Sequence, residues 1–169
     1  MHVWRKLRSL GALYLQQSVC LLPARQKIKR EVALLIARVR AEGGTARSMT
    51  IIVTDQVERD ALIAEFNAAR DQEYAEVLER TPTMLEEIAQ ETERGRASYA
   101  EVEESEADLE RFRTWLSKIE QRDYFNAPGA AAAQAAVERC AEALQAFERT
   151  ALMIEYGGEP PLPDVDEVG

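Results

Sequence analysis

Residues 3–23 read VWRKLRSLGALYLQQSVCLLP, and this stretch decides the fold class. An alternating run at 12–16, ALYLQ, and an apolar run at 19–23, VCLLP, predict two strands close enough to form a hairpin. Before them, apolar residues at helical spacing predict a helix that ends at Gly11, and these residues are Val3, Trp4, Leu7 and Leu10. A helix followed by a hairpin is typical of an α+β unit.

The next two elements suggest which α+β unit this is. A helix is predicted from Arg25 to Gly43, with one apolar face made of Ile28, Val32, Leu35, Ile36 and Val39. The β-branched run MTIIVT at 49–54 then predicts a buried strand. The order helix, strand, strand, helix, strand matches a ferredoxin-like βαββαβ unit without its first strand. Because that strand is central in the sheet, we expect a start about 15–20 residues upstream, or a partner chain that supplies the strand.

After Thr54 the sequence is almost wholly helical. Asp55 and Glu58 have the spacing of a capping box and open a long helix, which Pro82 is expected to interrupt or kink, with Thr81 or Thr83 as the new cap. Gly95 ends this stretch.

Two further helices follow. Ser98 and Glu101 form the next capping box, and that helix is predicted to reach about Phe125. Pro128 suits the first turn of an alanine-rich helix that stops at residues 157–158.

Apolar residues in steps of three and four run along all three helices and predict that they pack as an antiparallel bundle. These residues are Val102, Ser105, Leu109, Phe112, Leu116 and Ile119 in one helix, and Val137, Cys140, Leu144, Phe147, Ala151 and Ile154 in the last. The first of the three helices keeps the same spacing, with polar residues in its first half, at Ile63, Asn67, Arg70, Tyr74, Val77, Thr81, Met84 and Ile88.

The sequence therefore predicts an α+β fold that is mostly α, with a small incomplete ferredoxin-like unit followed by an antiparallel helical bundle. The expected domains are the α/β unit at 1–55, the bundle at 56–156, and a disordered acidic tail or linker at 157–169.

Composition argues against several classes of protein. Hydrophobic residues make up 46% and charged residues 30%, as in a globular chain. No stretch approaches 18 apolar residues, so we expect no membrane contact. The cysteines Cys20 and Cys140 are far apart and His2 is the single histidine, so we expect a cytoplasmic protein without a metal site or cofactor. No phosphate loop, nucleophile elbow or histidine base is present, and we expect no catalytic residues and no enzyme activity.

Charge is unevenly distributed along the chain. Residues 1–50 carry ten Lys and Arg against Glu31 and Glu42, a net charge of +8, whereas the whole chain has −9. The candidate nucleic-acid-binding residues are Arg5, Lys6, Arg8, Arg25, Lys27, Lys29 and Arg30. Phosphate contact, ordinary surface solubility and contact with the chain's own acidic half all remain open, since no specific DNA-binding motif is present.

Two residue types, arginine and cysteine, raise further alternatives. Arg70 occupies an apolar position of its helix, where an arginine must be paired, and Asp71, Glu73 or an acid on a facing helix would serve. A structural ion pair is the main interpretation, and contact with a tetrahedral anion is the alternative. For Cys140 and Cys20 the sequence favours buried thiols over redox sensors.

The residues also resemble a known family. VWRKLRSLGALYLQQSVCLLPA at 3–24, FNAARDQEYAEVLERTP at 66–82 and YAEVEESEADLERFRTWLSKIEQRDYF at 99–125 resemble, in order, the N-terminal domain of the chromate-resistance regulatory protein ChrB, over about residues 3–155. The opening is also similar, over a shorter span, to the ferredoxin-like module of PaaX transcriptional repressors. In the ChrB family an apolar strand normally precedes VWR, and many relatives continue into a C-terminal sensing domain.

The resemblance implies a bacterial regulatory protein that controls a chromate-efflux operon in response to chromate. The expected partners are promoter DNA, a separate ChrB C-terminal-type domain and a second copy of the chain. A protein-interaction module without DNA contact is the alternative function, and a chromate reductase is a third, for which the sequence shows no reactive thiol pair.

Overall fold

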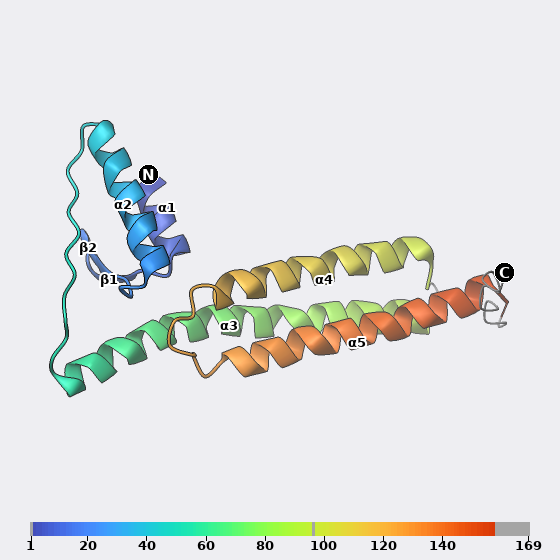
Figure 1. Ribbon diagram of the computed structural model, residues 1–169. Coiled ribbons are helices and arrows are strands. Elements are labelled where there is room, and N and C mark those ends of the chain that lie inside the picture. The colour runs from blue at the N-terminus through green and yellow to red at the C-terminus, as the bar shows by residue number, and fades with distance from the viewer. Residues whose placement is uncertain (1, 96, 158–169) are drawn as a thin grey trace, which may run out of the picture. The chain divides into compact units, whose positions relative to one another are not determined.

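The computed structural model describes residues 2–95 and 97–157, and these residues are mostly helical (Figure 1). In chain order the elements of this described part are α1 (His2–Ser9), β1 (Leu13–Gln16), β2 (Val19–Leu21), α2 (Gln26–Ala41), α3 (Gln56–Glu93), α4 (Tyr99–Glu120) and α5 (Ala130–Glu155). They divide into two compact units. The first unit comprises the described residues up to Glu73 together with Lys118–Pro128, and the second comprises Tyr74–Ser117 together with the described residues from Gly129 onward.

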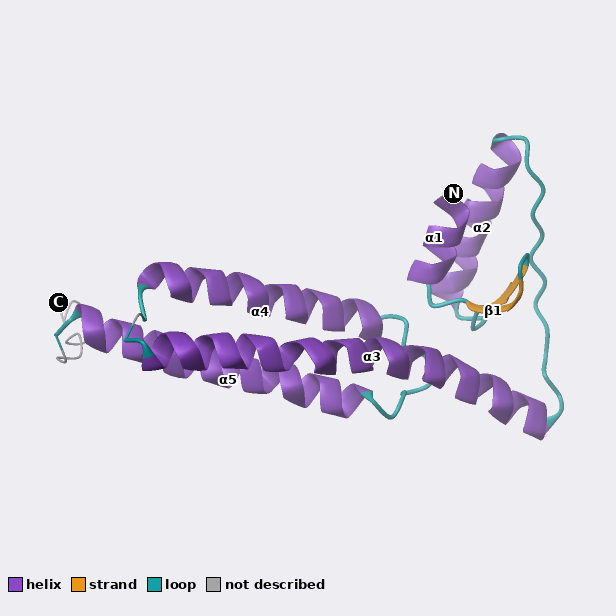
Figure 2. Ribbon diagram, turned by 180° about the vertical axis from the view of Figure 1, so that it is seen from behind, coloured by secondary structure: helices purple, strands orange, loops and turns teal. Residues whose placement is uncertain are grey.

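The first unit begins with the predicted helix and hairpin. Helix α1 ends before Gly11, which has a φ of +74°, a conformation that glycine adopts without steric cost. Strands β1 and β2 pair antiparallel, with Tyr14 opposite Cys20. Helix α2 begins and ends close to the predicted residues, and both views place it beside α1 (Figures 1 and 2). The helix, the hairpin and the second helix are therefore confirmed.

The strand predicted at 49–54 is not formed. Residues 44–55 have no regular structure, and the described part of the chain contains a single two-stranded sheet. No hydrogen bond joins the backbone of residues 45–54 to the backbone of any other described residue. A β-branched sequence favours extended backbone, but a strand exists only where a neighbouring strand accepts and donates its hydrogen bonds. The prediction of a ferredoxin-like sheet therefore holds only for its hairpin.

The second unit is an antiparallel bundle built from the latter part of α3, from α4 and from α5 (Figure 2). The predicted apolar positions form its core, where Val77 and Cys140 have no measurable solvent exposure. Ile154, in contrast, lies exposed near the end of α5. The prediction of an antiparallel helical bundle is thus confirmed, with a core that stops one turn earlier than predicted.

Pro82 does not interrupt α3, which runs continuously from Gln56 to Glu93. Because proline has no N–H group, the carbonyl of Leu78 four residues earlier loses its helical donor. The Thr81 hydroxyl donates a hydrogen bond of 3.4 Å to that carbonyl oxygen. The helix therefore continues through proline because a neighbouring side chain replaces the missing donor.

Two helices begin at the predicted N-caps, Asp55 and Ser98. Asp55 Oδ1 accepts hydrogen bonds from the N–H groups of Val57 and Glu58, at 2.7 and 3.2 Å, and Ser98 Oγ accepts one from Glu101 at 3.4 Å. Helix α4, however, ends at Glu120 rather than near Phe125. The predicted tail, 157–169, lies outside the described residues apart from Gly157. None of the described helices is both long and apolar enough to span a bilayer.

Candidate functional site

Three of the predicted basic residues lie on α1 and are exposed. Lys6 Nζ lies 2.6 Å from Glu31 Oε2 on α2, and this hydrogen-bonded ion pair lowers the pKa of the Glu31 carboxyl. Arg8 lies beside the Tyr14 hydroxyl. Arg5 makes no ion pair with any described residue. Arg5 and Arg8 therefore have no carboxylate partner among the described residues, whereas Lys6 has one.

The other four basic residues lie at the start of α2. Arg25 precedes the helix, donates a 2.7 Å hydrogen bond to the carbonyl oxygen of Tyr124, and stacks 5.1 Å from the centre of that ring. Lys27, Lys29 and Arg30 lie exposed on the first turns of the helix. Arg25 therefore has a structural role, whereas the three residues after it present charge to solvent.

The basic residues on α1 and those at the start of α2 belong to the same unit. Helices α1 and α2 lie side by side, and the Lys6–Glu31 pair joins them (Figure 1). We call the exposed residues Arg5, Lys6, Arg8, Lys27, Lys29 and Arg30 the basic surface. In water such side chains attract phosphate groups without selecting a base sequence.

A shallow hollow of about 350 Å³ lies beside the basic surface, lined by Trp4, Arg8, Tyr14, Leu15, Gln16 and Gln17. The rings of Trp4 and Tyr14 are 5.4 Å apart and tilted by 36°, and the Tyr14 hydroxyl donates to the Trp4 carbonyl oxygen at 3.3 Å. Burial, with the nearby Cys20 thiol, raises the pKa of Tyr14, and Arg8 partly opposes this. The phenol therefore remains a neutral donor at neutral pH.

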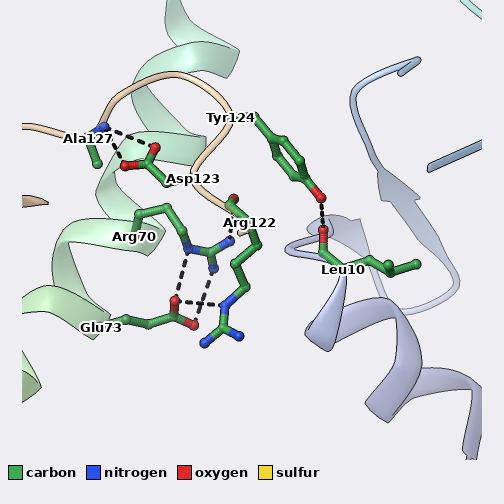
Figure 3. Close-up of polar contacts among 7 residues, drawn as sticks. All are labelled: Leu10, Arg70, Glu73, Arg122, Asp123, Tyr124 and Ala127. Atoms are coloured by element: carbon green, nitrogen blue, oxygen red, sulfur yellow. Dashed lines mark hydrogen bonds and ion pairs between the residues drawn. The ribbon is translucent and has the colours of Figure 1, made fainter. Parts of the chain in front are cut away.

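Arg70 belongs to a partly buried ionic cluster of the first unit (Figure 3). Its Nη2 donates to Glu73 Oε1 at 3.4 Å, and its Nη1 donates to the Arg122 carbonyl oxygen at 3.4 Å. Its Nε lies 3.1 Å from Glu73 Oε2, outside the angle of a hydrogen bond. The Arg122 Nε also donates to Glu73 Oε2, at 3.0 Å. One carboxylate therefore holds two guanidinium groups, and the cluster keeps a net positive charge.

The turn after α1 packs directly on this cluster. A Cβ atom at Gly11 would lie 2.6 Å from Arg70 Nη1 and 2.9 Å from Arg122 Cβ, so a side chain there would collide with both arginines. The Tyr124 hydroxyl donates a 2.6 Å hydrogen bond to the Leu10 carbonyl oxygen. Burial raises the pKa of Tyr124, against the opposing effect of Arg25, Arg70 and Arg122.

The loop between α4 and α5 carries Arg122 and Tyr124, which contact Glu73 and Leu10. The Asp123 carboxylate accepts hydrogen bonds from the Ala127 N–H at 3.0 and 3.1 Å, and Asn126 has a φ of +59°. The sequence offered Glu73 as a partner for Arg70, and the structure has that pair. Arg122 and Tyr124 were missed because the helix was predicted to run through them, which would have turned their backbone groups toward their own helix.

Both predicted cysteines are at least partly buried in the structure. Cys140 is buried and its Sγ lies 3.7 Å from the Thr81 carbonyl oxygen, and burial raises the pKa of its thiol. Cys20 is half-buried, and burial raises its pKa also. Among residues 2–95 and 97–157 no group of His, Cys, Asp and Glu has the arrangement of a metal site.

The family model described as "Protein ChrB, N-terminal" matches residues 1–155. No curated protein and no solved structure matches the chain. The match covers nearly all of the 169 residues, including α1, the hairpin and all three helices of the bundle. The chain therefore belongs to the ChrB N-terminal domain family, which is associated with chromate resistance.

Proposed function

We propose that this chain is a chromate-responsive transcriptional regulatory protein that contacts promoter DNA through the basic surface. In this proposal it acts in the cytoplasm, carries out no catalysis, and works with a ChrB C-terminal-type domain. Family membership supports the link to chromate resistance, and the observation that supports DNA contact is the basic surface itself.

The basic surface is positively charged although the chain as a whole is acidic. The protein has a net charge of −9, yet Arg5, Lys29 and Arg30 lie exposed without an ion pair in the described residues. Interactions between exposed charges are largely screened beyond about 8–10 Å at physiological salt, so a local cluster decides what binds there. A cluster of this kind attracts a polyanion despite an acidic total.

The test is the salt dependence of binding to the promoter of the adjacent resistance operon. Each phosphate contact contributes a slope of about 0.9 to the fall of log K with log salt, so Arg5→Ala with Arg8→Ala should reduce the slope by about 2. Fluorescence anisotropy on the full chain, at several salt concentrations, measures it.

A matched control comes from α4, where Arg111 and Arg113 are exposed. Arg111→Ala with Arg113→Ala removes the same charge and should leave the slope unchanged. Equal slopes for the two double variants, or no salt-dependent binding by the wild type, would refute the proposal.

A protein-interaction module without DNA contact is the second candidate function. The last turns of α5 expose Leu152, Met153 and Ile154, together with Tyr156. Exposed apolar side chains in one place are typical of a protein contact. In this case the wild-type protein should capture a ChrB C-terminal-type domain, and the double variant Leu152→Glu with Met153→Glu should not. Such capture by a wild-type protein that does not bind DNA would favour this function.

A further inference from the structure

Residues 47–55 carry the two most exposed apolar side chains among the described residues of the first unit, Met49 and Ile52. Met49, Ile51 and Ile52 are 84%, 60% and 86% exposed, in an open segment between α2 and α3 (Figure 1). The backbone of residues 45–54 makes no hydrogen bond to another described backbone group. The carbonyl oxygens of Ala46 and Thr54 accept hydrogen bonds from the side chains of Arg40 and Arg59. A β-branched sequence whose backbone groups have no backbone partner is a site for pairing with another strand.

The sequence of this segment is complementary to itself. In an antiparallel pair of two copies centred on Ile51, Arg47 of one copy faces Asp55 of the other, and Met49 faces Val53. Because side chains alternate between the two faces of a strand, these residues share one face. That face has an apolar centre of six side chains and an ion pair at each end.

Neighbouring registers lose this match. A shift of the centre to Thr50 places Arg47 opposite Val53, and a shift to Ile52 places Asp55 opposite Met49. Both shifts also leave the remaining charge without a partner. Opposite charges and β-branched pairs across two strands stabilise pairing, so the register centred on Ile51 is favoured.

The cap of α3 is compatible with such a pair. The N–H groups of Val57 and Glu58 donate to Asp55 Oδ1, and neither bond uses Oδ2. The second oxygen is therefore left for the guanidinium group of Arg47 in the other copy.

We propose that residues 47–55 join two copies of this chain as an antiparallel strand pair, with a two-fold axis at Ile51. A second copy is the occupant because the apolar centre and both ion pairs come from one self-complementary sequence, as a two-fold symmetric contact requires. The inference does not rest on DNA contact, and its test contains no DNA.

Sedimentation velocity of the full chain, from low to high micromolar concentration, tests the proposal. The wild type should form dimers. Ile51→Lys places two lysines opposite each other on the axis and should raise the dissociation constant at least about tenfold. Leu34→Lys is the control, since Leu34 is similarly exposed on α2 and lies outside the segment.

Disulfide trapping tests the register. Opposed residues of antiparallel strands have Cα atoms about 4.5–5.5 Å apart, a separation that a disulfide spans. Ile51→Cys should therefore form a covalent dimer faster than Leu34→Cys, with wild type reporting the reactivity of the native cysteines. A wild type that stays monomeric, a dimer unaffected by Ile51→Lys, or equal trapping of the two cysteine variants would each overturn the proposal.

Discussion

The Tyr124 hydroxyl and the Leu10 carbonyl oxygen are joined by a 2.6 Å hydrogen bond across 114 residues of sequence (Figure 3). Leu10 lies in the turn between α1 and β1, and Tyr124 lies in the loop between α4 and α5. Because burial raises the pKa of Tyr124, its hydroxyl stays protonated and remains a donor at neutral pH. This bond therefore fixes the end of α1, the helix that carries Arg5 and Arg8, to the rest of the first unit.

Tyr124→Phe should lower the free energy of unfolding by about 1 kcal/mol, because the Leu10 carbonyl loses its donor while the ring that stacks with Arg25 is kept. Urea unfolding followed by circular dichroism measures this. Tyr156→Phe, at an exposed tyrosine, is the control and should change stability little. Equal effects of the two variants would contradict the role of the bond.

Gly11→Ala should destabilise more than Gly43→Ala. Both glycines have positive φ, +74° and +81°, and a non-glycine residue in that conformation costs about 1–2 kcal/mol. A Cβ at Gly43 meets no atom within 4 Å, whereas one at Gly11 meets Arg70 and Arg122. The crowding should add at least about 1 kcal/mol to the Gly11 variant in the same unfolding measurement. If the two variants are equally stable, the turn does not pack on the arginines.

Glu73→Gln should leave two arginines without a counter-charge. Removal of one partner from a fully buried pair costs about 3–5 kcal/mol, and a smaller loss of about 2 kcal/mol is expected because the Glu73 side chain is 27% exposed. Glu76→Gln removes an exposed carboxylate from the same helix and should be nearly neutral. A Glu73 variant as stable as the Glu76 variant would show that the cluster contributes nothing.

Lys6→Met should raise the pKa of Glu31 toward its usual value, since the bond from Lys6 is the main cause of its lowered pKa. A lowered pKa means that the pair stabilises the fold above the usual carboxyl pKa, and that this contribution is lost as pH falls through the lowered value. NMR titration of the Glu31 side chain measures the shift. Lys118→Met, which removes a charge that does not act on Glu31, should leave the titration unchanged.

Pro82→Ala should stabilise the protein by about 1–2 kcal/mol, because alanine supplies the missing N–H to the Leu78 carbonyl and outweighs the extra freedom of the unfolded chain. Thr81→Val should be destabilising when Pro82 is present and less so in the Pro82→Ala background. In that background the Leu78 carbonyl accepts a hydrogen bond from the N–H group of the alanine and no longer depends on the Thr81 hydroxyl. Additive effects of the two substitutions in unfolding experiments would contradict this account.

The features predicted well from sequence are those that depend on neighbours along the chain. The caps at Asp55 and Ser98, the turn at Gly11 and the apolar faces of the bundle follow from residue type and spacing. The interruption predicted at Pro82 is wrong, because the adjacent Thr81 hydroxyl donates to the Leu78 carbonyl oxygen. Proline alone predicts a break, because it lacks the N–H group that the Leu78 carbonyl needs; the Thr81 hydroxyl supplies that donor here.

The sequence by itself determined the helices, the hairpin and the concentration of positive charge in the first fifty residues, since each depends on local propensity and composition. Only the tertiary structure decided that 49–54 pairs with no strand among the described residues and that Arg70, Glu73 and Arg122 share one cluster. A strand needs hydrogen bonds from a distant segment, and a buried arginine needs a carboxylate that the fold brings to it. Both depend on which remote segments meet, and spacing along the chain does not contain that information.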